Sequence, residues 1–139
     1  MIGIVVVTHG QLSEQLVATA SMIVGEAKEI KAVTFMPRES LEDLKQKAAA
    51  ATCEFTTDGC LILTDIMGGS ATNVSIEIMK SRTDVEVVTG VNLPMLVEAI
   101  TCRESLSLKE VAAQISNSGV KSIINLKEFF EKRAAKRRV

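Results

Sequence analysis

The nearly continuous apolar run Ile2–Val7 (IGIVVV) constrains the fold more than any other part of the sequence. A strand with one face in water alternates apolar and polar residues, whereas an unbroken run is expected where both faces are covered. Such strands form parallel sheets with helices on both sides, and each parallel pairing needs a long crossover connection. The run therefore predicts that strands and helices alternate along the chain.

The remaining sequence has this alternation. Three further runs rich in β-branched or apolar residues predict strands at Ile30–Phe35, Gly59–Thr64 and Asp84–Thr89. The segments predicted to be helical from their caps, prolines and apolar spacing are Ser13–Gly25, Ser40–Phe55, Asn73–Lys80, the stretch opened by Pro94, and Ser107–Ser118. Ser13 and Ser40 are the expected N-caps of the first two.

The C-terminal part of the chain is expected to add one strand and one helix. Gly119 should end the preceding helix, Val120–Ile124 should form a short edge strand, and Asn125 should cap a final helix. No linker or repeat divides the sequence, so 1–139 is expected to be one domain with a basic helical tail at about 126–139. The expected fold is α/β, a three-layer flavodoxin-like arrangement with a mostly parallel sheet in the order 2-1-3-4.

The composition excludes several classes of protein. With 47% hydrophobic residues the chain is a globular sequence, and no run of about 20 apolar residues predicts a membrane span. The N-terminus lacks the basic segment and cleavage site of a signal peptide, so a cytoplasmic protein is expected. Five of the 16 Lys and Arg residues lie within 132–138. The rest is acidic, which argues against nucleic-acid binding, and the basic tail is interpreted as a solvated helix end.

The sequence offers no obvious metal site. His9 is the single histidine, and Cys53, Cys60 and Cys102 form no CxxC pair, whereas a zinc site needs about four nitrogen or sulfur ligands. The three cysteines are interpreted as small buried hydrophobic residues in a reducing compartment. Neither a metal nor another cofactor is expected.

Polar or glycine-rich segments follow three of the predicted strands. They are Thr8–Gln11, Asp65–Asn73 and Gly90–Asn92. In α/β sheets ligands bind beyond the carboxyl ends of the strands, near the point where the strand order reverses. The first and third strands are neighbours in the expected order, so His9 and Asp65 should face one crevice.

The residue types at this crevice suit phosphoryl transfer. An imidazole can accept a group directly, and a carboxylate on one ring nitrogen fixes the tautomer that leaves the other nitrogen free to attack. Gly68, Gly69 and Ser70 could bring backbone N–H groups and a helix N-terminus to an anion. A structural histidine, an acidic turn residue and an ordinary strand-to-helix turn remain alternatives. The sequence has no GxxxxGK[ST] or GxGxxG motif, so P-loop and dinucleotide sites are unsupported.

Taken together, these segments resemble the mannose-family enzyme IIA of the bacterial sugar phosphotransferase system. The similarity is carried by Ile4–Gly10 (IVVVTHG), Leu63–Asn73 (LTDIMGGSATN) and Thr89–Leu96 (TGVNLPML), and it extends over roughly residues 1–125. The chain departs from the family pattern at Ala71, often a proline, and at Ile66–Met67, where a Leu-Phe-like pair is usual.

The resemblance implies a site and a set of partners. His9 would accept a phosphoryl group from phospho-HPr on Nε2 and pass it to an enzyme IIB, while Asp65 would hold Nδ1. The residues implied to bind the phosphoryl oxygens or to border the site are Ser70, Gly68, Gly69, Thr8 and Asn92. A homodimer that exchanges Val120–Ile124 between its subunits is also implied, as is indirect association with the membrane subunits IIC and IID.

Three interpretations stay open at this point. The first is a phosphocarrier in sugar uptake, and the second is a regulatory sensor that uses the same histidine to report phosphotransferase flux. The third is a binding module that is not phosphorylated and takes a small anion in the GGS crevice. Met67, Leu93 and Met95 are candidates for an adaptable rim that contacts partners, with core packing the alternative for the last two.

Overall fold

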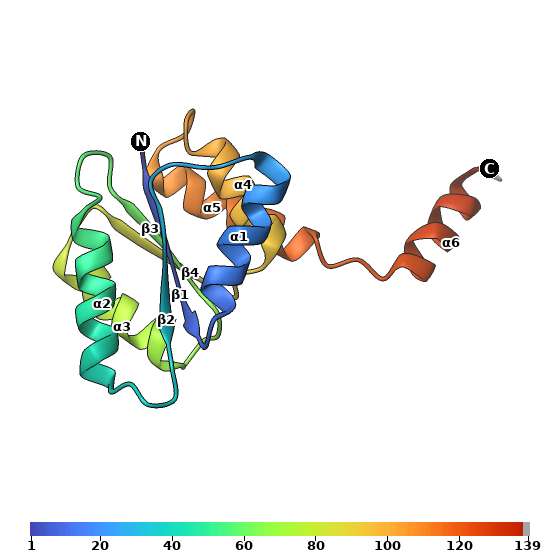
Figure 1. The fold of residues 1–139 in the computed structure, drawn as a ribbon. Coiled ribbons are helices and arrows are strands. Elements are labelled where there is room, and N and C mark those ends of the chain that lie inside the picture. Colours follow the sequence, from blue (N-terminus) through green and yellow to red (C-terminus); the bar gives the residue numbers. More distant parts are fainter. Residues whose placement is uncertain (138–139) are drawn as a thin grey trace.

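The computed structural model describes residues 1–137 and has a four-stranded parallel sheet between two layers of helices (Figure 1). The strands are β1 (Gly3–His9), β2 (Ile30–Phe35), β3 (Cys60–Thr64) and β4 (Val85–Thr89). Their order is β2-β1-β3-β4, and every pairing is parallel. The predicted fold class and strand order are therefore confirmed.

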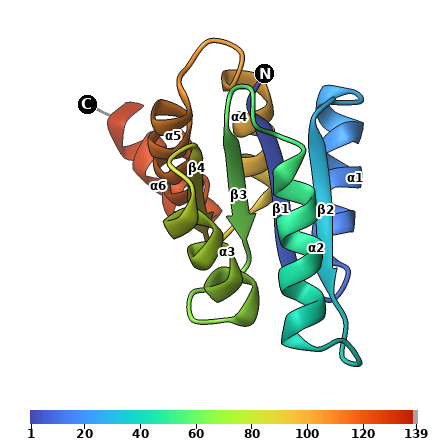
Figure 2. The ribbon, with the colours of Figure 1, turned by 90° about the vertical axis from the view of Figure 1, so that its left-hand side faces the viewer.

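Two groups of helices cover the two faces of the sheet (Figure 2). One face carries α1 (Leu12–Val24), α4 (Leu93–Cys102) and α5 (Leu108–Lys121), and the other carries α2 (Leu41–Cys53) and α3 (Ser70–Ser81). Along β1, Ile4 and Val6 join the first core while Val5 and Val7 join the second, and all four are fully buried. The apolar run at the N-terminus is therefore unbroken because both faces of β1 are buried, as predicted.

The start of α1 differs from the prediction that Ser13 caps it. The helix begins one residue earlier, and Ser13 is buried inside its first turn. The Thr8 hydroxyl, at the end of β1, accepts the Ser13 N–H at 2.7 Å, while the Ser13 hydroxyl donates to the Val33 carbonyl at 3.0 Å. Ser13 thus links α1 to β1 and β2 through these two hydrogen bonds. It does not cap the helix itself, because the Thr8 hydroxyl of β1 accepts the N–H of the first turn.

The predicted edge strand at Val120–Ile124 is wrong for the single chain. α5 continues through Gly119 to Lys121, and residues 122–125 are a turn and an irregular segment. A Cβ on Gly119 would lie 2.5 Å from Cγ of Met95, so this glycine permits close packing of α5 on α4 and does not end the helix. The exchange of the segment between two subunits is a separate prediction and stays one.

The basic tail forms a helix, α6 (Leu126–Arg137), that lies away from the three layers (Figure 1). The Asn125 side chain accepts the Glu128 N–H at 3.2 Å, as its predicted capping role requires. All described residues of α6 are exposed, and Arg138 and Val139 of the predicted tail lie outside the described residues. No helix within residues 1–137 has the length and apolar character needed to cross a membrane.

The cysteines are not all buried as predicted. Cys60 and Cys102 lie in the core, whereas Cys53, at the C-terminal end of α2, is exposed. Burial raises the pKa of the Cys60 thiol to about 12. That thiol therefore stays protonated and inert at neutral pH.

Candidate functional site

The sheet register brings His9 and Asp65 together. Val7 of β1 pairs with Thr64, the last residue of β3, so β1 extends beyond β3 at this edge. Asp65 immediately follows β3 and therefore lies beside the end of β1, where His9 is the last strand residue. The juxtaposition expected from the strand order is present.

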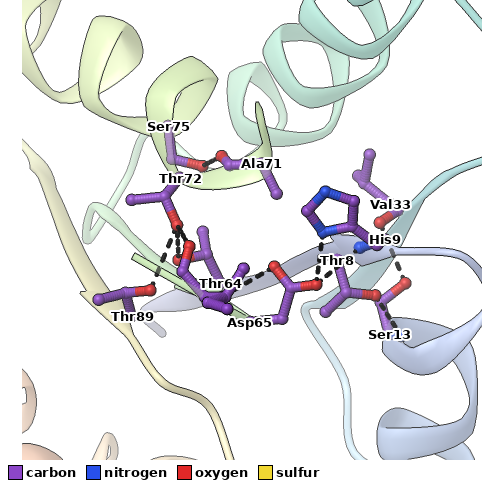
Figure 3. Close-up of polar contacts among 11 residues, drawn as sticks. Thr8, His9, Ser13, Val33, Thr64, Asp65, Ala71, Thr72, Ser75 and Thr89 are labelled. Atoms are coloured by element: carbon purple, nitrogen blue, oxygen red, sulfur yellow. Dashed lines mark hydrogen bonds and ion pairs between the residues drawn. The ribbon is translucent and has the colours of Figure 1, made fainter. Parts of the chain in front are cut away.

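The Asp65 carboxylate holds both the ring and the backbone of His9 (Figure 3). Its Oδ2 atom lies 2.8 Å from Nδ1 and accepts the His9 backbone N–H at 2.9 Å. Oδ1 accepts the Ile66 N–H at 3.0 Å. The His9 side chain is 49% exposed and that of Asp65 is 13% exposed, so a partner can reach the ring while the acid is shielded behind it.

This geometry determines which ring nitrogen is free. An ionised carboxylate only accepts hydrogen bonds, so the proton of a neutral His9 ring lies on Nδ1 and the Nε2 lone pair is available. Partial burial works to raise the pKa of Asp65. Hydrogen bonds from the backbone and ring of His9, together with Ile66 N–H, outweigh that effect and leave the pKa below its usual value. Figure 3 shows Nε2 on the side of the ring away from the carboxylate.

The glycine turn after Asp65 is shaped around the histidine ring. Gly68 has φ of 83°, a conformation that favours glycine. A Cβ on Gly69 would lie 2.9 Å from Cε1 of His9, closer than carbon atoms pack. The second glycine is therefore needed for the approach of the ring, which the sequence did not indicate.

α3 begins next to this ring without a side-chain cap. Its N-cap is Gly69, which has no side chain to accept the N–H groups of the first turn. The first turn consists of Ser70, Ala71 and Thr72, and its N–H groups lack partners within the helix. Uncapped N–H groups and the helix dipole together favour an anion near the Cε1–Nε2 edge of the ring. Ser70 is partly exposed at this point.

Thr8 and Asn92, two residues implied to border the site, use their side chains to bond helix backbones. Thr8 is fully buried, and its hydroxyl caps α1. The Asn92 amide caps α4 by accepting the Met95 N–H at 3.0 Å and donates to the Gly119 carbonyl at 3.3 Å. Both side chains therefore hold the framework of the site in this structure.

The apolar residues proposed for a rim divide into two groups. Met67 is 73% exposed and its neighbour Ile66 is 60% exposed, so both are accessible on the glycine turn. Met95 is buried in the core and Leu93 packs against it. Phe35 was not anticipated, and its ring centroid lies 6.0 Å from that of His9.

A group of three threonine hydroxyls beneath the turn was also missed. The Thr72 hydroxyl lies 2.7 Å from that of Thr64 and 3.2 Å from that of Thr89, and it donates to the Ile66 carbonyl at 2.7 Å (Figure 3). Thr64 and Thr89 are the last residues of adjacent strands and are register partners. Two threonines ending neighbouring predicted strands are the signal that could have revealed this network.

Comparison with protein families matches residues 3–116 to the EIIA-man model, described as the phosphotransferase system (PTS) fructose IIA component. The mannose-specific EIIAB component of Escherichia coli K12 is 38% identical over an alignment of 127 residues, with coverage of 88% of this chain and 39% of that protein. The chain thus spans about two fifths of the length of this relative. The fructose-specific EIIA component of Bacillus subtilis is 29% identical over 95% of this chain and 91% of its own length.

Solved structures resemble the whole three-layer fold. The phosphotransferase system component EIIA from Streptococcus agalactiae superposes with a TM-score of 0.86 at 26% identity, covering 92% of this chain and 99% of that one. The mannose/sorbose-specific IIA subunit from Enterococcus faecalis has a TM-score of 0.83 at 28% identity, covering 89% and 93%.

Proposed function

Since its residues 3–116 match the EIIA-man model, the chain belongs to this family of phosphotransferase-system IIA components, and we propose that it is a phosphocarrier. His9 accepts a phosphoryl group from phospho-HPr and passes it to an enzyme IIB. The observation that carries the proposal is the exposed His9 ring whose Nδ1 lies 2.8 Å from the shielded Asp65 carboxylate.

The acceptor step is an in-line displacement at phosphorus. The Nε2 lone pair of His9 attacks the phosphorus of the incoming phosphohistidine. The bond between phosphorus and the donor nitrogen breaks as the new N–P bond forms, and the electron pair returns to the donor ring. The proton on Nδ1 of His9 does not move. Such a transfer depends on positioning and charge stabilisation, so a prealigned ring supplies much of what it needs.

Two opposite charges develop at the site, and both have a neighbour of the right sign. A ring that carries phosphorus on Nε2 and hydrogen on Nδ1 is cationic, and the Asp65 carboxylate bonded to Nδ1 stabilises it. The phosphoryl oxygens are anionic, and they would bind the uncapped N–H groups at the start of α3 and the Ser70 hydroxyl. The phosphoryl group then leaves in a second in-line displacement, in which a histidine nitrogen of enzyme IIB attacks the phosphorus and the Nε2–P bond breaks, returning its electron pair to Nε2 of His9.

The expected homodimer belongs to the same proposal. Val120, Ile123 and Ile124 are 73%, 79% and 50% exposed in the single chain. Large apolar side chains in sequence at such exposure favour burial against a partner. Sedimentation of the full chain tests this, and a monomer at micromolar concentration would contradict the exchange of this segment.

The phosphocarrier proposal is tested by labelling with phosphoenolpyruvate, enzyme I and HPr. One acid-labile phosphate is expected per chain, and His9→Gln should abolish it while circular dichroism and thermal unfolding stay close to wild type. Label that persists in His9→Gln would overturn the assignment, because the chain has no second histidine.

Asp65→Asn tests the orienting acid separately. It should slow transfer, since the amide no longer selects the Nδ1–H tautomer. Asp84→Asn is the matched control, because Asp84 pairs with Arg82 at the other end of the sheet. Equal transfer rates in Asp65→Asn and wild type would show that Asp65 does not orient the ring. A regulatory sensor would give the same labelling, and it differs from a transport component by binding a target in one phosphorylation state.

A further inference from the structure

The threonine network has one possible direction. The Ile66 carbonyl can only accept, so the single hydroxyl proton of Thr72 points to it across 2.7 Å. Thr72 then has lone pairs left to accept, and the protons in its bonds to Thr64 and Thr89 come from those two residues. The Thr64 and Thr89 hydroxyls therefore donate to the Thr72 hydroxyl, which in turn donates to the Ile66 carbonyl.

That carbonyl belongs to the residue that joins the acid to the glycine turn. Ile66 donates its N–H to Oδ1 of Asp65 at 3.0 Å, and its carbonyl accepts the Gly69 N–H at 3.3 Å as well as the Thr72 hydroxyl. In this loop Asp65 bonds the His9 ring, and Gly69 lies directly against it. The conformation of Ile66 thus sets the positions of both contacts.

The bond from Thr72 is the stronger of the two that hold the carbonyl. At 2.7 Å it is a short O–H···O bond, while the 3.3 Å bond from Gly69 is beyond the usual range for N–H···O. Thr64 and Thr72 are 0% and 2% exposed, so water does not replace either hydroxyl. Cooperative chains of buried hydrogen bonds hold their geometry more firmly than single bonds.

We propose that Thr72, supported by Thr64 and Thr89, is a positioning residue that holds Asp65 and Gly69 in place around His9 through the Ile66 carbonyl. The proposal rests on the phosphocarrier function for its effect on transfer, but its effect on the ring is independent of phosphorylation. It assigns to three residues outside the His–Asp pair a defined part in preparing the acceptor nitrogen.

The test compares three variants. Thr72→Val keeps the branched shape and removes the hydroxyl, and Thr72→Ser restores a hydroxyl. Thr52→Val is the matched control, because Thr52 is also buried, at 1% exposure, and within residues 1–137 its hydroxyl bonds only to the Ala48 and Ala49 carbonyls of α2. Thermal unfolding reports the general cost of losing a buried hydroxyl in each variant.

Two measurements separate positioning from stability. The first is the ¹⁵N resonances of the His9 ring, which give the proportion of the Nδ1–H tautomer and need no assignment among several histidines. Thr72→Val should raise the proportion of Nε2–H, whereas Thr52→Val should not. The second is the rate of phosphoryl transfer from phospho-HPr, which should fall by about three- to tenfold in Thr72→Val, the range expected for one hydrogen bond. Thr72→Ser should recover most of both.

The outcomes are distinct. Wild-type ring resonances and transfer in Thr72→Val, or changes of equal size in Thr52→Val, would overturn the positioning role. A tautomer change in Thr72→Val together with an absence of labelling in wild type would support the positioning role and refute the proposed function. If Thr72→Val does not fold, Thr89→Val carries the test, since Thr89 is partly exposed and its bond is the longer one at 3.2 Å. A smaller change in the same direction is then expected, and none would overturn the proposal.

Discussion

The contact between Gly69 and the His9 ring permits a substitution that should damage transfer and spare the fold. At φ −79° and ψ 165°, Gly69 has a backbone conformation that alanine adopts readily. The added Cβ in Gly69→Ala would lie 2.9 Å from Cε1 of His9 and 3.0 Å from Cγ2 of Ile66. Both atoms belong to exposed side chains, and the nearest backbone atom, the Ile66 carbonyl oxygen, is at an ordinary contact distance of 3.4 Å, so the side chains are expected to move and the backbone to stay.

The size of the effect follows from these distances. Carbon atoms in contact are about 3.5–4.0 Å apart, so the ring must retreat by roughly 0.6–1 Å. The 2.8 Å bond between Nδ1 and Asp65 has a margin of about 0.4 Å before it leaves the normal range. Loss of a hydrogen bond to a charged group costs about 1.5–3 kcal/mol. If that cost falls on the transition state, transfer slows by roughly 10- to 150-fold.

The assay is rapid-quench transfer from phospho-HPr alongside urea unfolding, with Gly25→Ala as the opposite control. Gly25 has φ of 85° and ψ of 174°, and nothing lies within 4 Å of a Cβ there. Alanine in that conformation should cost about 1–3 kcal/mol of unfolding free energy and leave transfer unchanged. Gly69→Ala should change the unfolding free energy by less than about 1 kcal/mol, because the lost bond to the half-exposed His9 ring contributes little to folding in water and alanine also restricts the unfolded chain. The reasoning is refuted if Gly69→Ala transfers at the wild-type rate, or if its loss of activity follows a loss of stability.

Three further predictions concern stability. The pKa of Asp65 is lowered in the fold, so wild type should be more stable than Asp65→Asn at neutral pH, and the difference should disappear as pH falls below the usual carboxyl value of 3.8; urea unfolding at several pH values checks this, and a constant difference would contradict it. Gly119→Ala should lower the unfolding free energy by about 1–3 kcal/mol through overpacking against Met95, and a neutral result in thermal unfolding would show that the core can adjust. Arg103 is buried and donates to the carbonyls of Ile2, Lys28 and Glu29; Arg103→Met should cost about 1–3 kcal/mol because the Ile2 and Lys28 carbonyls lose this donor, while the Glu29 carbonyl keeps the Ile4 N–H, and an unchanged urea midpoint would be inconsistent with that role.

The sheet could be predicted from sequence because its signal is local. A run such as Ile2–Val7 is expected to be buried on both faces, which indicates helices on both sides of the sheet. The flavodoxin-like strand order expected for this alternation then places His9 and Asp65 at one edge, as the structure shows. The pairing of ring and acid follows from this order, so it too was predictable.

The differences arise where a residue serves a neighbour in another helix or strand. Gly119 was interpreted as a helix end, but its small size matters because Met95 packs on it. Ser13 was interpreted as a cap, but Thr8 caps the helix through its buried hydroxyl. The network around Thr72 joins the ends of two strands and the start of a helix. Local pattern does not encode contacts of this kind.

Because one Asp65 oxygen bonds both the imidazole and the backbone N–H of His9, the ring is restrained against swinging away from the sheet. It keeps one position at the edge of the sheet, at the end of β1. If His9 carries the phosphoryl group as proposed, the donor and recipient proteins must each bring their reactive atom to the same point in space, one after the other. The rate of such a relay would then depend on how well two different partner proteins fit one surface around His9. Shape complementarity at that surface becomes the property on which selection can act.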